Sequence, residues 1–443
     1  MNKLEIKLKQ HTPLIHFQHD QEGATLRASE VKPKLDKYIM SKLSSEEKEN
    51  GRNEGWIKSK GDKVWLDYRM KIKAKGEPKE FLIASLLSPT RIFDENHEEI
   101  RKSDLPFKIL GSTPFFAQEN INSSNKQEDS PVFLKRKNEQ GQYDYIYNEN
   151  TWESIDKKGV MWDELEITIL STYDKLLKNI DNTIAEFFTC TNFGTRSNKG
   201  FGSFTRDNDT RVLEHLKSNY KFVYGKKCQG DNLNTIFRKI KEDYQKLKSG
   251  INHNGYTKSI LFCYAVKEME NNPRWEKRFF KKAAKDRMGY NKRLLDKEHA
   301  PITDADGNMS WNDPQKYDYR YLRAVLGLAE QYEFLLEFSK DGKWKRDNRE
   351  KLVVRPKNRD KEIERYKSPL LIKVIDDTIY IVGEEVNNKI LGKEFSVNYS
   401  IGQRELPVSD EYKRLVTPES FCLSEFMNFA MSPEFKLGYK KEK

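Results

Sequence analysis

The sequence predicts an α+β protein made of two ferredoxin-like (RRM-like) modules with helical and loop insertions. In the first half of the 443 residues, the expected elements run strand, helix, strand, strand, helix, loop, strand, which is the order of a ferredoxin-like unit. Apolar and charged residues alternate along the first two strands, as in a sheet with one buried and one solvated face. The elements after residue 210 suffice for a second module. We therefore expect modules over residues 1–210 and 211–443.

The elements of the first module follow from residue spacing. They are a strand over residues 4–8, a helix over 26–39, strands over 66–74 and 166–170, and an amphipathic helix over 173–188. Ser29 is the expected N-cap of the first helix. We also expect a buried strand over residues 81–87 and a polar insertion or mobile loop over residues 119–150.

The second half is assigned in the same way. The expected elements are a helix over residues 232–247, a buried strand over 260–266, a basic helix over 274–287, a helix over 317–330, a hairpin over 370–382 and a final helix over 421–431. Asp376 and Asp377 are expected at the hairpin turn. On the basic helix, Trp275, Phe279 and Phe280 fit a core or a subunit interface better than RNA stacking.

The composition indicates a soluble, globular protein with a polyanionic partner. With 34% charged and 12% aromatic residues, the chain is too rich in aromatics for a disordered polyelectrolyte. The net charge of +11 favours a polyanion, and nucleic acid is expected ahead of a membrane because no amphipathic Lys/Arg helix stands alone. No apolar run approaches the roughly 20 residues that span a bilayer, and the first residues lack the apolar core of a signal peptide, so we expect a cytoplasmic protein. The four cysteines have no C-x-x-C spacing. We expect no metal site, disulfide framework or cofactor.

The most distinctive stretch is the glycine-rich loop of residues 193–204, directly after the strongest helix. A nucleotide-binding P-loop precedes its helix and ends in Gly-Lys-Ser/Thr, so this loop does not fit one. It fits a backbone-reading loop for a polyanion, with a tight turn as the alternative. The residues expected to bind RNA here are Gly194, Arg196, Ser197, Asn198, Lys199, Gly200, Phe201 and Gly202. For Phe201, stacking on a base and packing in the core remain equally open.

Two further basic groups are candidates for the same ligand. Arg27, Lys32 and Lys34 follow the first strand and lie near the start of a helix. Arg69, Lys71 and Lys73 form a stripe on one face of the second strand, as expected of an electrostatic contact on a sheet surface. A solvated charged face is the alternative for each.

Three stretches together resemble the RAMP superfamily, the ferredoxin-like RNA-binding subunits of CRISPR effector complexes. They are the loop at residues 193–204, Thr12-Pro13-Leu14 with residues 26–32, and residues 321–328 with residues 365–373. The last pair looks most like the large RAMP subunit of the type III-B (Cmr) effector. In place of the small-residue and glycine run usual at the first helix, this chain has Ala28-Ser29-Glu30.

The resemblance implies a non-catalytic subunit that binds CRISPR guide RNA, neighbouring RAMP subunits and target RNA, near the 3′-proximal end of the guide. The alternative is a metal-independent RAMP endoribonuclease that processes repeat RNA, with His16 as general base taking the proton of a 2′-OH. His11 and His19 lie in the same region, and a hydrogen-bonded surface role is the simpler reading for all three. Residues 304–315 begin like a calcium loop but end in Gln315, so we interpret them as a turn.

Overall fold

The computed structural model describes sixteen stretches of the chain. These are residues 1–15, 26–83, 90–110, 122–123, 132–154, 158–252, 256–270, 273–276, 279, 319–328, 332–336, 350–357, 363, 366–401, 404–407 and 414–442. The chain forms two compact units, one of Met1–Glu242, Leu371–Gly383 and Tyr439–Lys443 and the other of Asp243–Leu370 and Glu384–Gly438. Helices and mostly antiparallel sheets together confirm the α+β class. The expected module boundary at 210/211 stays a prediction.

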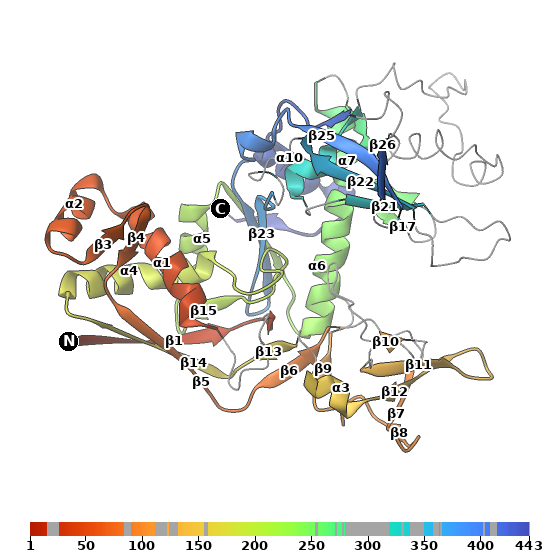
Figure 1. The fold of residues 1–443 in the computed structure, drawn as a ribbon, viewed down its shortest axis with the longest axis horizontal. Coiled ribbons are helices and arrows are strands. Elements are labelled where there is room, and N and C mark those ends of the chain that lie inside the picture. The colour runs from red at the N-terminus through yellow and green to blue at the C-terminus, as the bar shows by residue number, and fades with distance from the viewer. Residues whose placement is uncertain are drawn as a thin grey trace. The chain divides into compact units, whose positions relative to one another are not determined.

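The expected element order of the first ferredoxin-like module is confirmed (Figure 1). Its elements are β1 (Asn2–Gln10), α1 (Ala28–Lys42), β5 (Arg69–Lys75), β14 (Glu164–Ser171), α4 (Asp174–Cys190) and β15 (Phe204–Arg206). The sheet order is β15-β1-β14-β5, and each neighbouring pair is antiparallel. This is the arrangement in which each helix connects two strands that are not neighbours.

The core of this module lies between the sheet and its two helices. Ile6 of β1 pairs with Ile167 of β14, which in turn pairs with Ile72 of β5, so one sheet face is apolar. Leu35 of α1 and Ile180 of α4 are fully buried against that face. The N-cap of α1 is Arg27 and not Ser29, because the helix already begins at Ala28.

A helix and a hairpin follow α1 in the chain. They are α2 (Ser45–Asn53), β3 (Ile57–Lys60) and β4 (Lys63–Leu66). Ser44 caps α2 in a capping box with Glu47, although no expectation covered this region. Gly51 of α2 lies so close to β3 that a Cβ there would stand 2.6 Å from Ile57 Cδ1.

The stretch between β5 and β14 corrects the expected polar loop. It contains β6 (Lys79–Leu82), β7 (Thr90–Phe93), β8 (Glu99–Ile100), β9 (Lys108–Ile109), β10 (Asn122–Ser123), β11 (Phe133–Lys137), β12 (Tyr143–Tyr147), α3 (Glu149–Ser154) and β13 (Gly159–Met161). One sheet has the order β10-β11-β12-β7-β8, and β2 (Leu14–Ile15) joins another in the order β2-β13-β6-β9. Phe133, Tyr145 and Trp152 lie in their own core. Alternating aromatic residues therefore form strands despite the polar composition.

The second four-stranded sheet of the first unit has the same strand arrangement. Its strands are β16 (Phe222–Lys227), β23 (Leu370–Ile375), β24 (Thr378–Gly383) and β28 (Lys440–Lys441). In the sequence, α6 (Leu233–Lys248) follows β16, and α10 (Leu423–Ala430), which belongs to the second unit, precedes β28, with further elements of the second unit in between. The sheet order is β23-β24-β16-β28, the same order as in the first module. The predicted hairpin turns at Asp376, which has a positive φ of 50°. Helix α5 (Val212–Asn219) precedes β16.

Two predictions in the second unit are wrong. Residues 260–266 are not a strand but belong to α7 (Ile260–Lys267), which Ser259 caps by accepting from the Phe262 amide. An unbroken apolar run fits a buried helix as well as a buried strand. Residues 317–330 are not one helix, since they contain β20 (Tyr319–Arg320) and the 3₁₀ helix η3 (Leu322–Leu326).

The second unit also holds a seven-stranded sheet. Its other strands are β19 (Arg274–Trp275), β21 (Tyr332–Leu336), β22 (Glu350–Pro356), β25 (Glu394–Ile401), β26 (Arg404–Pro407) and β27 (Arg414–Val416). Small elements are β17 (Ile251–Asn252), β18 (Tyr256–Thr257), η5 (Asn388–Ile390) and η7 (Pro433–Phe435). The expected basic helix over 274–287 begins as strand β19. Phe279 is buried, and Phe280 and residues 281–287 lie outside the described residues.

Candidate nucleic-acid interface

The face of the first sheet opposite α1 and α4 is solvated and mostly basic. Side chains on this face are Lys3, Glu5, Lys7 and Lys9 of β1, Glu164, Glu166, Thr168 and Leu170 of β14, and Arg69, Lys71, Lys73 and Lys75 of β5. Seven of these are cations and three are carboxylates. Strand alternation puts them there, because the intervening residues pack into the core.

Ion pairs neutralise only part of this face. Lys7 Nζ lies 3.1 Å from Glu164 Oε1, and Lys75 Nζ lies 2.9 Å from Glu166 Oε2. These lysines hold the pKa of both carboxyl groups below the ordinary value. In the described part of the chain, Arg69, Lys71 and Lys73 have no ion-pair partner. Strand β5 is the sheet edge, so three unpaired cations line one border of the face.

The glycine-rich loop is held by the first module through its backbone. The Gly202 amide donates to Pro13 O at 2.9 Å, and the Gly194 amide donates to Glu30 Oε1 at 3.0 Å. Gly194 has a φ of 73°, and a Cβ there would stand 2.5 Å from Ile15 O. Both amides therefore donate hydrogen bonds within the protein. The prediction that Gly194 and Gly202 bind RNA through their backbone is therefore not supported by the geometry.

The middle of the same loop lies along β23, an edge strand of the second sheet. The Ile372 amide donates to Asn198 O at 3.2 Å, and the Asn192 side chain donates to Ser197 O at 2.7 Å and Ile372 O at 2.9 Å. The Ser203 hydroxyl donates to Val374 O at 2.6 Å. The loop is thus a joint between the two ferredoxin-like sheets, a role that sequence reasoning missed.

Phe201 faces the core. Its ring stacks on Phe237 of α6 with the centroids 4.3 Å apart, and the side chain is fully buried. This settles the alternative that the sequence left open, and base stacking by Phe201 is withdrawn. Gly200 beside it is buried as well, against Ile240 and Val374.

Arg196 and Lys199 keep partial access to solvent in the loop. Arg196 has a left-handed backbone with a φ of 57°. Burial, with a smaller contribution from the neighbouring Arg196 charge, lowers the pKa of Lys199 to about 8. Both side chains remain candidates for phosphate contacts, as do the half-buried Ser197 and Asn198.

The basic residues of α1 differ in their availability. Lys32 Nζ donates to Asp36 Oδ2 and to Leu66 O, both at 2.8 Å, and lies 4.0 Å from the centre of the Tyr68 ring. It is a structural residue, which corrects its place among the RNA-binding candidates. Lys34 pairs with Glu30 at 2.8 Å, so the Glu30 carboxylate accepts from both the Lys34 ammonium and the Gly194 amide. Arg27 is half-buried at the start of α1.

A fully buried lysine, Lys373 of β23, was also missed. Its Nζ donates to Phe188 O at 2.7 Å and to Thr191 O and Phe204 O at 3.0 Å. Two of these carbonyls lie at the C-terminal end of α4, where a cation is favourable. Burial lowers the pKa of Lys373 to about 7. The signal in the sequence was a lone lysine within an apolar strand.

His11, the described member of the histidine cluster at the first strand, does not support catalysis. His11 is buried, its Nε2 lies 2.8 Å from Thr205 Oγ1, and its Nδ1 accepts from the Asp376 amide at 3.0 Å. Burial lowers its pKa despite the nearby Asp376 carboxylate. Both ring nitrogens are therefore used within the fold. His16, the base in the endoribonuclease alternative, and His19 lie outside the described residues, as do residues 304–315.

Neither a metal cluster nor a membrane span is found where the structure is described. No group of three or more potential metal ligands occurs within the described ranges. Among the same residues, no helix is both long and apolar enough to cross a bilayer.

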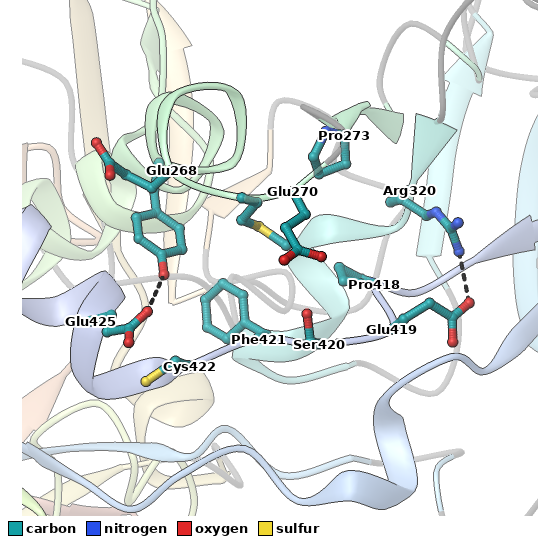
Figure 2. Close-up of a pocket in the computed structure, with 12 residues that line it drawn as sticks. Glu268, Glu270, Pro273, Arg320, Pro418, Glu419, Ser420, Phe421, Cys422 and Glu425 are labelled. Atoms are coloured by element: carbon teal, nitrogen blue, oxygen red, sulfur yellow. Dashed lines mark hydrogen bonds and ion pairs between the residues drawn. The ribbon is translucent and has the colours of Figure 1, made fainter.

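A cavity of about 320 Å³ in the second unit is acidic (Figure 2). Arg320 Nη1 lies 3.1 Å from Glu419 Oε1, and the Tyr264 hydroxyl donates to Glu425 Oε2 at 3.4 Å. Glu268 and Glu270 add further negative charge to the lining. Because carboxylates repel phosphate, we exclude this cavity from the nucleic-acid interface.

Comparison with known proteins identifies the family. The chain matches the model of the Cmr1 N-terminal domain over residues 1–251 and that of the Cmr1 C-terminal domain over residues 256–439. A comparison with curated proteins gives no match. Among solved structures, the apo crystal structure of Cmr1 from Pyrococcus furiosus is similar at 11% sequence identity and a TM-score of 0.34, covering 100% of this chain and 98% of that chain.

Proposed function

This chain belongs to the Cmr1 family of RAMP subunits of type III-B CRISPR effectors, and on that premise we propose that it binds guide RNA in such an effector without cutting RNA. Its partners are the guide, the target RNA and other RAMP subunits, and its place is near the 3′-proximal end of the guide. Binding there contributes to assembly of the complex and to capture of the target.

The observation that carries the proposal is the row of Arg69, Lys71 and Lys73 at the border of the solvated sheet face. Unpaired cations on a sheet attract a nucleic-acid backbone, and RRM-like sheets commonly present this face to RNA. Arg196, Ser197, Asn198 and Lys199 of the loop form a second set of contacts, with Arg27 and Lys34 of α1 beside them. The net charge of +11 supports attraction over a longer range.

The absence of cutting is proposed because His11, the described histidine of the cluster at the first strand, uses both ring nitrogens within the fold and is not available as a general base. Among the described residues at that end of the sheet, Lys9 and Asp376 pair with each other at 2.7 Å and His11 is buried. The endoribonuclease alternative then depends on His16.

The test is to incubate the purified full chain with labelled single-stranded repeat RNA in the presence of a chelator, and to follow both binding and cleavage. We expect binding that weakens with salt, with the RNA left intact. Metal-independent cleavage that is lost in His16→Ala would establish the endoribonuclease instead. No binding even at low salt would reject the RNA-binding role.

A further inference from the structure

The hairpin β3–β4 carries an exposed tryptophan among lysines. Trp65 is 39% exposed, and among the described residues the only other exposed large hydrophobic side chains are Val64 at 45% and Met1 at 69%. By contrast, Trp56 and Trp152 are 2% and 3% exposed. A single exposed side chain needs no ligand, so what Trp65 can bind depends on the side chains that share its face.

The register puts the aromatic ring and the cations on one face of the hairpin. Trp65 is directly opposite Lys58, and Lys63 is directly opposite Lys60. Opposed residues of an antiparallel pair share a face, and alternate pairs share the same one. Trp65 therefore shares its face of the hairpin with Lys58, Lys60 and Lys63. Lys60 and Lys63 have no ion-pair partner within the described ranges, and Lys58 Nζ lies 3.8 Å from Asp67 Oδ2.

The other face of the hairpin anchors it to the module. Ile57 pairs with Leu66, and both are buried, with Ile57 lying against Gly51 of α2. The Leu66 amide donates to Asp36 Oδ2 at 3.2 Å, and the Asp67 amide donates to Trp56 O at 2.9 Å. One face of the hairpin is thus packed on the module, and the face that carries Trp65 is exposed to solvent.

From this arrangement we infer a second RNA contact on β3–β4, at which Trp65 stacks on an unpaired base while Lys58, Lys60 and Lys63 bind adjacent phosphates. The inference rests on the proposed function. Aromatic rings flanked by cations are the elements of single-strand binding, and stacking is tolerant of sequence because every base has a π-face. A protein partner fits less well, because Val64 lies on the opposite face and, within the hairpin, Trp65 shares its face only with lysines.

The experiment measures binding of labelled oligouridine to the purified full chain by fluorescence anisotropy. Variants are Trp65→Ala, Trp65→Phe and Lys60→Gln/Lys63→Gln, with Val64→Ala as the matched control on the opposite face. Stacking on an aromatic ring is worth about 1–3 kcal/mol, so we expect Trp65→Ala to raise Kd roughly 5- to 150-fold. Trp65→Phe retains a ring and should recover most of the affinity. Val64→Ala should bind like the wild type.

The outcomes separate this inference from the proposed function. Wild-type binding that persists unchanged in Trp65→Ala overturns the hairpin contact and leaves the RNA-binding role intact. Loss of co-purifying subunits in Trp65→Ala, with oligouridine affinity unchanged, assigns the hairpin to a protein partner and overturns the inference as well. If the wild-type chain does not bind RNA at all, the proposed function fails first. Thermal unfolding of each variant checks that the fold is retained.

Discussion

The solvated sheet face allows a quantitative test of guide binding. Arg69→Gln, Lys71→Gln and Lys73→Gln together remove three cations that are exposed and unpaired in the described structure. On single-stranded nucleic acid, each neutralised phosphate contributes about −0.7 to the slope of log K against log salt. If each cation contacts one phosphate, the slope of the triple variant becomes less steep by about 2. Exposed side chains of this kind change stability little, so the fold should persist.

The assay is anisotropy of labelled guide RNA over a series of salt concentrations. The control removes the same charge from Lys37, Lys178 and Lys221, which are exposed but lie away from this face. We expect the control to keep the wild-type slope apart from a small general effect of net charge. Equal slopes in the triple variant, the control and the wild type would refute the placement of RNA on this face.

Three further predictions concern the loop and the joint. Lys199 has a pKa of about 8, and only its ammonium form binds phosphate, so RNA affinity should fall as pH rises through 8. Lys199→Arg should abolish that pH dependence. The measurement is a series of anisotropy titrations at different pH values, and identical pH profiles of RNA affinity for the variant and the wild type would remove Lys199 from the interface. Glu30→Gln removes the carboxylate that pairs with Lys34 and accepts from the Gly194 amide, so RNA affinity should rise about two- to fivefold. The control Glu214→Gln on α5 should not change the affinity. A reduced or unchanged affinity in Glu30→Gln argues against RNA at this end of α1. Lys373→Met leaves three buried carbonyls without their donor and should cost roughly 3 kcal/mol or more in urea unfolding. The pKa of Lys373 in the folded protein, about 7, lies below its unfolded value, so between these two values the unfolded chain binds more protons than the folded one. The free energy of unfolding of the wild type should therefore rise from pH 7 to 10 by an amount that Lys373→Met lacks. Parallel plots of unfolding free energy against pH for the two proteins would contradict this.

Period-two alternation was enough to predict the sheet face from the sequence. Lys71 and Ile72 are neighbours in sequence but lie on opposite faces, and the pattern states this directly. The run at 260–266 offered no such alternation, so only the cap at Ser259 and the packing decide that it is helical. The aromatic strands between residues 133 and 147 were hidden because polar residues separate them.

The role of the loop could not be predicted, because its partners are distant in the chain. Asn192 and Ile372 are 180 residues apart, and Gly194 and Glu30 are 164 apart. Glycines that fit a phosphate also fit a close crossing of two backbones, and the sequence of the loop does not distinguish these uses. Lys373 was open to prediction, since a lysine inside an apolar strand needs several acceptors when it is buried.

The structural role of the glycine-rich loop determines which variants can test RNA binding. A side chain at Gly194 or Gly202 would disturb the packing of the loop on the first module before any RNA is added, so lost binding in such a variant would not identify an RNA contact. Arg69, Lys71 and Lys73 lie on the sheet edge away from β15, whereas Lys9 at the other end of the face is already paired with Asp376. Charge removal on β5 therefore separates binding from folding in a way that substitution of the loop glycines does not. For this reason, substitutions at the sheet edge, and not in the glycine-rich loop, are the direct test of the RNA-binding proposal.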